Sequence, residues 1–230
     1  MNRKKFLVIF SIVLFAALIG GVMSSNNLLL KSEPSTISIL QKLSRPSTAG
    51  ALPLGSNTAK VTLIEFGDYQ CKYCHKFYVD TKRTILENFV NTGKVKFLFK
   101  DFPVIDLPYN KASTLAAEAS YCAADQGKYW QYHDELYNNW KGENTGWITK
   151  NNLEQFANNI KIGNINQFSR CVESGKYAGV VADNTNLAKV TGITITPSFV
   201  ILGHGNQPPL KIVGVQPYSV LENAINRLSV

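Results

Sequence analysis

The chain has 230 residues, of which 45% are hydrophobic, and its formal net charge is +8. This length and composition suffice for one domain with a sizeable core, or for one domain that carries an insertion, and they exclude disorder as the default state. No long block of like charges occurs, so the modest positive excess argues against a nucleic-acid-binding protein.

An export signal is predicted at the N-terminus. Three basic residues at positions 3–5 precede an uncharged apolar run at 6–22. At about 17 residues this run is long for a cleaved signal peptide and short of the roughly 20 residues that cross a bilayer. Residues 1–23 are therefore predicted to be a signal peptide or an N-terminal membrane anchor that places the rest of the chain outside the cytoplasm.

The segment after this leader has the composition of a linker. Residues 24–59 are rich in Ser, Thr, Asn and Pro and contain only short apolar stretches. Such a composition is typical of a tether, here with a partly helical N-terminal extension.

A strand, a cysteine-containing loop, a helix and a second strand are predicted next. Residues 60–66 (KVTLIEF) are apolar on both alternating faces, which is typical of a buried central strand. From Cys74 onward, apolar residues recur at three- and four-residue spacing up to Gly93, which favours the end of a helix. A second strand at 94–101 then implies a parallel crossover connection.

The middle of the chain is predicted to be an all-helical insertion. Apolar residues recur at helical spacing in five successive segments, at about 112–123, 129–140, 150–160, 165–174 and 177–190. Afterwards, two short apolar runs at 198–202 and 210–213 predict an antiparallel hairpin, and an amphipathic helix at 220–228 closes the chain. The fold class is therefore α/β.

Cys71 and Cys74 form a CxxC motif at the predicted start of the first helix of this α/β fold. Unsatisfied N–H groups and the positive end of the helix dipole favour a thiolate there, so we expect a lowered pKa for Cys71. Cys74 is expected to be more buried and close enough to form a disulfide with Cys71. One sulfur would attack or be attacked, and the other would resolve.

The same CxxC spacing also occurs in half of a zinc site. Such a site needs two further ligands close by, whereas Cys122 and Cys171 stand alone in the helical region and the three histidines are scattered. The sequence therefore favours redox chemistry, and it predicts neither a metal nor an organic cofactor.

Several segments of the chain resemble the thioredoxin superfamily. They are residues 54–56 (LGS), 61–66 (VTLIEF), 67–77 (GDYQCKYCHKF) and 196–200 (TPSFV). Within the superfamily, residues 121–123 (YCA) and 126–130 (QGKYW) are similar to the DsbA and BdbD type. The likeness spans about 53–228.

This resemblance implies a thioredoxin fold with a helical domain inserted between the second strand and the cis-proline strand. The thioredoxin-fold parts would be 60–108 and 191–230, and the inserted helical domain would be 109–190. It also implies that Pro197 is cis and that the Thr196 backbone lies beside the Cys71 sulfur, where it would pair with an incoming peptide. A trans proline in a turn is the alternative.

Glu65 places a carboxyl group in the middle of an apolar strand, which costs several kcal/mol unless the group is protonated or paired. Its position matches the buried acid that the family keeps near the second cysteine, so Glu65 is a candidate proton relay for Cys74. A partner cation would come from Lys96 or Lys100 on the neighbouring strand. The alternative is a strand-end carboxylate that faces water.

Lys72 and Tyr73, between the two cysteines, depart from the Pro-His or Pro-aromatic pairs that oxidases of the family often carry. A positive charge on Lys72 would stabilise the thiolate of Cys71 and make the disulfide more oxidising. The effect would be small if Lys72 is flexible and exposed. Both residues are candidates for tuning the redox potential, and they leave the direction of electron flow open.

Cys122 and Cys171 both fall on the apolar stripes of their predicted helices. Burial and export favour a structural disulfide between them, which would contribute about 4 kcal/mol in the chain-entropy model. Two buried free thiols, or a second redox relay, are the alternatives.

The sequence thus predicts an extracytoplasmic thiol–disulfide oxidoreductase that introduces disulfides into exported proteins. A disulfide isomerase or reductase is the alternative within this chemistry, and a thiol-based metal-binding or chaperone module is the alternative outside it. The resemblance implies a membrane quinone-linked partner of the DsbB or VKOR-like type that reoxidises the enzyme. A calcium site, as in some relatives, is left undecided.

Overall fold

The computed structural model describes residues 35–205 and 207–229. The predicted leader, 1–23, and the first part of the predicted tether therefore lie outside the described residues. Within the described ranges, no helix combines the length and apolar character that crossing a membrane requires.

Four strands form one mixed sheet in the order β2-β1-β3-β4. They are β1 (Val61–Gly67), β2 (Val95–Asp101), β3 (Ser198–Leu202) and β4 (Leu210–Val213). β1 pairs in parallel with β2 and antiparallel with β3, and β3 pairs antiparallel with β4. Every residue of the central strand β1 is buried, which explains its apolar run and confirms the predicted central strand and hairpin.

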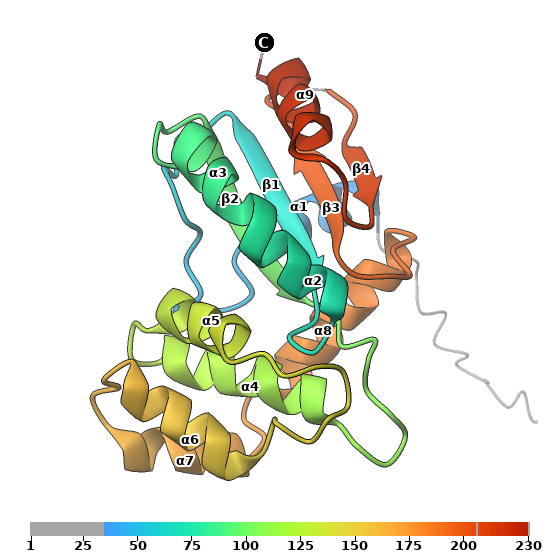
Figure 1. Cartoon of the computed structure of the whole chain (residues 1–230). Coiled ribbons are helices and arrows are strands. Elements are labelled where there is room, and N and C mark those ends of the chain that lie inside the picture. Colours follow the sequence, from blue (N-terminus) through green and yellow to red (C-terminus); the bar gives the residue numbers. More distant parts are fainter. Residues whose placement is uncertain (1–34, 206, 230) are drawn as a thin grey trace, which may run out of the picture. The chain divides into compact units, whose positions relative to one another are not determined.

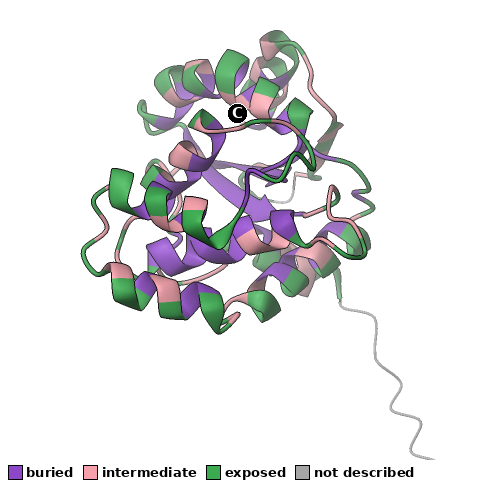
Figure 2. Ribbon diagram, turned by 60° about the horizontal axis from the view of Figure 1, so that its bottom comes forward, coloured by how far each residue is buried: buried purple, intermediate pink, exposed green. Residues whose placement is uncertain are grey.

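Helices cover both faces of this sheet (Figure 1). A helix of four successive segments covers one face together with α9 (Tyr218–Leu228). The four segments are α2 (Lys72–Phe77), η1 (Tyr78–Lys82), α3 (Arg83–Ile85) and η2 (Leu86–Val90), of which η1 and η2 are π-helical. The other face packs against α1 (Thr36–Ser44) and α8 (Ala178–Val190). Figure 2 shows buried strands between helices whose outer surfaces are exposed; β1, β2 and β3 are almost entirely buried, whereas the edge strand β4 is partly exposed.

The tether and N-terminal extension predicted for residues 24–59 contain the expected helical part, and the part that the structure describes packs against the sheet. Helix α1 begins with Ser35, whose hydroxyl accepts a hydrogen bond from the Ser38 N–H, and it buries Leu43 against the sheet. Leu54 then forms a β-bridge to Phe97 of β2. The polar composition concealed this packing because a short helix needs only a few apolar residues to dock.

The helical insertion lies between β2 and β3, as predicted. It contains α4 (Ala112–Ala124), α5 (Tyr129–Asn138), α6 (Lys150–Asn159), α7 (Ile165–Glu173) and α8. Figure 1 shows α4 to α7 gathered together, and they share a core rich in alanine and aromatic residues. Its last helix, α8, contacts both α4 and strand β2, so the insertion and the sheet meet along this helix.

Candidate active site

Cys71 and Cys74 lie where the central strand passes into the first helix. Cys71 is the N-cap residue of α2, and its carbonyl oxygen accepts the first helical hydrogen bond from the His75 N–H, at 3.0 Å. Cys71 is 3% exposed and Cys74 is completely buried, and neither is in a disulfide. The helix start therefore holds one sulfur at the surface of the core and one inside it.

The pKa values of the two sulfurs are shifted in opposite directions. A hydrogen bond with Cys74 lowers the pKa of Cys71 to about 6, helped by the backbone N–H groups of Tyr73 and Cys74 and opposed by burial. Burial raises the pKa of Cys74 well above its usual range, and the neighbouring Cys71 raises it further. At neutral pH the reduced pair therefore holds a thiolate at Cys71 and a thiol at Cys74.

The loop before β3 lies directly against the Cys71 sulfur. The Cys71 sulfur lies 3.4 Å from the Thr196 carbonyl oxygen, to which its protonated form donates a hydrogen bond, although 125 residues separate the two in sequence. The Thr196–Pro197 peptide bond is cis. Thr196 is buried, while Ile195 beside it is exposed. The structure thus brings together Cys71 and the two residues that the sequence had singled out in this loop.

Glu65 is buried in the sheet, only 2% exposed, so the alternative of a carboxylate facing water is wrong. The cation predicted for it is also wrong, because Glu65 pairs with Phe99 in the β1–β2 register and shares its face of the sheet. Lys96 and Lys100 alternate to the opposite face, where Lys100 donates to the Arg45 carbonyl oxygen.

The cation near Glu65 is instead Lys82, from segment η1 of the helix that covers this face. Burial raises the pKa of Glu65, and the Lys82 ammonium partly offsets this rise. Lys82 lies four residues after Tyr78 and three before Ile85, on the apolar stripe of the helix. A lysine on such a stripe was the sequence signal that could have revealed it.

Asp68 is a second buried acid at the site that the sequence analysis missed. Its backbone N–H donates to the Cys74 sulfur at 3.4 Å. Its carboxylate accepts hydrogen bonds from the N–H groups of Gln70, at 2.8 Å, and Ile105, at 2.9 Å. Burial raises the pKa of Asp68 to about 7. Asp68 therefore ties the cysteine loop to the segment after β2.

Lys72 and Tyr73 are both exposed. The Lys72 backbone N–H donates to a carboxylate oxygen of Glu143 at 2.8 Å, so an acidic residue of the loop between α5 and α6 reaches the first turn of α2. The same loop contains Trp140, whose ring stacks on His75 at 4.6 Å between centroids. The insertion thus contacts the cysteine motif directly, which no sequence pattern indicated.

Cys122 and Cys171 are joined by a disulfide that links α4 to α7, at a sequence separation of 49. Both lie in the core of the insertion, Cys122 among alanines and Cys171 beside Asp125 at 3.9 Å. The same apolar core extends to Cys71 and Cys74, but the disulfide joins only Cys122 and Cys171, so the four cysteines form two pairs in different elements.

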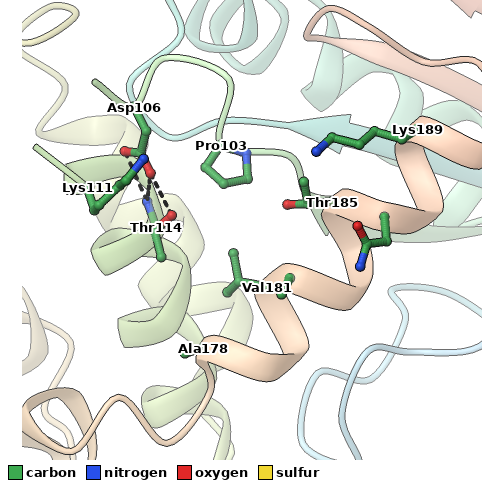
Figure 3. A pocket seen from close by; sticks show the side chains of 10 residues that line it. Pro103, Asp106, Lys111, Thr114, Ala178, Val181, Thr185 and Lys189 are labelled. Atoms are coloured by element: carbon green, nitrogen blue, oxygen red, sulfur yellow. Dashed lines mark hydrogen bonds between the residues drawn. The ribbon is translucent and has the colours of Figure 1, made fainter. Parts of the chain in front are cut away.

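A hollow of 520 Å³ lies elsewhere, between the segment that leads into α4 and the side of α8. Figure 3 shows Asp106 directed at Thr114, whose N–H and hydroxyl it binds at the start of α4. Lys111 and Lys189 lie on its two sides, and no cysteine lines it. The hollow is therefore distinct from the cysteine site.

A family model described as thioredoxin matches residues 47–216, well over half of the chain. The chain belongs to the thioredoxin family. Among curated proteins, disulfide bond formation protein D of Bacillus subtilis is 28% identical over 159 residues, which cover 68% of this chain and 70% of the relative. A probable disulfide bond formation protein D of Bacillus cereus is 28% identical over 158 residues, covering 67% and 71%.

Solved structures of this thioredoxin family share the whole fold. Oxidised BdbD from Bacillus subtilis superposes with a TM-score of 0.67 at 24% identity and covers 80% of this chain and 96% of that one. Wolbachia pipientis α-DsbA1 also gives a TM-score of 0.67 at 24% identity, with 79% and 92% covered. The predicted resemblance is confirmed: the chain is a DsbA/BdbD-like member of the thioredoxin family with a helical insertion.

Proposed function

We propose that this thiol–disulfide oxidoreductase introduces disulfides into exported proteins through Cys71 and Cys74. The observation that carries the proposal is the contrast between the two sulfurs: Cys71 caps the start of α2 and has a lowered pKa, whereas Cys74 is completely buried and has a raised pKa. A stabilised Cys71 thiolate favours the reduced form of the enzyme, and an enzyme that is stable when reduced is a strong oxidant when oxidised.

The reaction begins with the Cys71–Cys74 disulfide. A substrate thiolate attacks the Cys71 sulfur, so that a substrate–Cys71 bond forms and Cys74 leaves as a thiolate that takes up a proton. A second substrate thiolate then attacks the substrate sulfur of this mixed disulfide, and Cys71 leaves as a thiolate. The substrate loses two electrons to the enzyme, which is released reduced. In the reverse direction Cys71 is the nucleophile and Cys74 resolves.

Glu65 supplies the proton that Cys74 takes up. The support is its burial beside Cys74, with which it interacts electrostatically, and its raised pKa, which keeps it protonated near neutral pH. The Thr196 backbone would pair with the substrate chain, because its carbonyl oxygen already lies 3.4 Å from the Cys71 sulfur. Lys72 and Tyr73 are exposed and would tune the redox potential only slightly.

The site of action in this proposal is extracytoplasmic, at the outer face of the membrane or in a periplasm-like space. It rests on the leader predicted from residues 1–23 and on the similarity to disulfide bond formation protein D. The substrates would be exported proteins with cysteines. Reoxidation of the Cys71–Cys74 dithiol would fall to a membrane quinone-linked partner of the DsbB or VKOR-like type.

A redox titration of Cys71 and Cys74 against glutathione tests the direction of electron flow. A potential near about −120 mV is expected for a disulfide donor, whereas one near about −270 mV would identify a reductase and contradict the proposal. Because an isomerase lies between these values, the same preparation should also be assayed for oxidation of a reduced cysteine peptide. An isomerase would rearrange a scrambled substrate but oxidise the peptide poorly.

A further inference from the structure

Lys82 is a buried ammonium that two carboxyl groups share. Its side chain is 4% exposed, and its Nζ lies 2.6 Å from a carboxylate oxygen of Asp134 on helix α5. It also lies 3.2 Å from Nδ1 of His133 and interacts electrostatically with Glu65. The ammonium therefore forms an ion pair with an acid of the helical insertion and interacts electrostatically with the acid of the cysteine site.

The surroundings leave this ammonium few other partners. The rings of Tyr78 and Trp130 lie 4.9 Å and 5.3 Å from Nζ and close off the apolar sides. His133 is buried, and burial lowers its pKa to about 4, so it is neutral and adds no charge. Asp134 is half exposed, with 44% of its side chain accessible, and it is the only one of the three polar partners in contact with water.

Titratable groups face this cluster from each element that packs on it. They are Glu65 from β1, Cys71 and Cys74 from the start of the helix, Tyr78 and Lys82 from η1, and His133, Asp134 and Tyr137 from α5.

The charge of Asp134 determines whether ionisation of Glu65 is costly at neutral pH. With Asp134 ionised, the Lys82 ammonium is already neutralised, so ionising Glu65 would leave a net negative charge in the interior. Without the charge of Asp134, ionised Glu65 would become the counter-ion of Lys82, and the group of Glu65, Lys82 and residue 134 would carry no net charge. A buried net charge is costly and a buried neutral pair is much less so. The two carboxyl groups thus compete for one ammonium.

We propose that Asp134 is a positioning residue that keeps Glu65 protonated by occupying the Lys82 ammonium. The helical insertion then sets the proton supply of the cysteine site through Asp134 and Lys82. This inference deepens the proposed function and rests on it only for the role of the Glu65 proton, which passes to Cys74 when the Cys71–Cys74 bond breaks.

The charge of Glu65 can be followed directly by carboxyl ¹³C NMR of the reduced protein labelled at glutamate. The Glu65 signal is assigned by its loss in Glu65→Gln. In Asp134→Asn, the Glu65 titration midpoint should fall by about one pH unit, because Lys82 becomes its partner. In Lys82→Met it should rise by a similar amount. An unchanged or raised midpoint in Asp134→Asn would overturn the proposal.

A matched control separates this effect from the general loss of a negative charge. Asp80→Asn removes an aspartate that is similarly exposed and that pairs with Lys76 on the same helix as Lys82. Its Glu65 midpoint should stay within about 0.2 of the wild-type value, since exposed charges are screened. Thermal unfolding of each variant checks the fold, and Asp134→Ser replaces Asp134→Asn if the latter does not unfold cooperatively.

A rate measurement distinguishes failure of this inference from failure of the proposed function. The oxidised proteins are reduced with dithiothreitol from pH 5 to 9, and the ratio of variant to wild-type rate cancels the titration of the reagent. Asp134→Asn should become several-fold slower than wild type as pH rises through neutrality, since Glu65 loses its proton earlier. A shifted NMR midpoint with a pH-independent rate ratio would retain the charge competition and reject the relay role of Glu65.

Discussion

The molecule contains two pairs of cysteines in very different surroundings. Cys71 and Cys74 are three residues apart at the start of a helix, and buried titratable groups converge on them. Cys122 and Cys171 are 49 residues apart and join two helices inside an alanine-rich and aromatic core. Because burial is similar in both pairs, the reactivity of a cysteine pair is set by the groups that can stabilise a thiolate and deliver a proton.

The largest expected effect is the loss of Cys71. Cys71→Ser should lower the rate of oxidation of a reduced cysteine peptide by at least about 10³-fold, because a hydroxyl cannot form the mixed disulfide. The assay follows the free thiols of the peptide over time. The double variant Cys122→Ala/Cys171→Ala is the matched control, since it also removes two sulfurs. Near-wild-type oxidation by Cys71→Ser would refute the redox role of this pair.

For the Cys122–Cys171 pair in the insertion, we expect a loss of stability with little loss of activity. Removing the Cys122–Cys171 disulfide should reduce the free energy of unfolding by about 4 kcal/mol, because the loop it closes in the unfolded chain is long. Peptide oxidation by the folded variant should stay within about twofold of wild type. Urea unfolding monitored by tryptophan fluorescence measures the first quantity. A large loss of activity without a loss of stability would show that this pair takes part in the redox cycle.

Much of the fold could be predicted because its signals are local. The apolar run of the central strand, the helical spacing after Cys74 and the two runs around the hairpin each predicted an element close to where it lies. Helix α1 was not predicted as a packed element because its burial depends on a sheet face that is formed by residues far along the chain. Polar composition alone cannot reveal such docking.

Only those residues of the site that a local sequence pattern marks could be predicted. The CxxC motif and Glu65 stand out along the chain, whereas the cation for Glu65 depends on which face of the sheet each residue occupies. Successive residues of a strand point to opposite faces, so a shift of one residue changes the face. Lys96 and Lys100 were therefore predicted on the face of Glu65, although they lie on the other one, and Lys82 was overlooked. Glu143 and Asp134 reach the site from the insertion, and no local pattern marks an acid that contacts a distant helix.

The smallest expected effect concerns the difference in pKa between Cys71 and Cys74. Iodoacetamide alkylates only thiolates, so the rate for the reduced protein should be constant above about pH 7 and fall about tenfold per pH unit well below 6, the pKa of Cys71. Cys74 has a raised pKa and is buried, so it should contribute nothing in this range. Mass spectrometry after partial labelling locates the modified residue, and Cys74→Ala serves as the comparison.

Because the hydrogen bond from Cys74 is the main cause of the lowered pKa of Cys71, the Cys74→Ala variant should shift the alkylation profile upward in pH. An unshifted profile would mean that the backbone N–H groups at the helix start stabilise the thiolate by themselves.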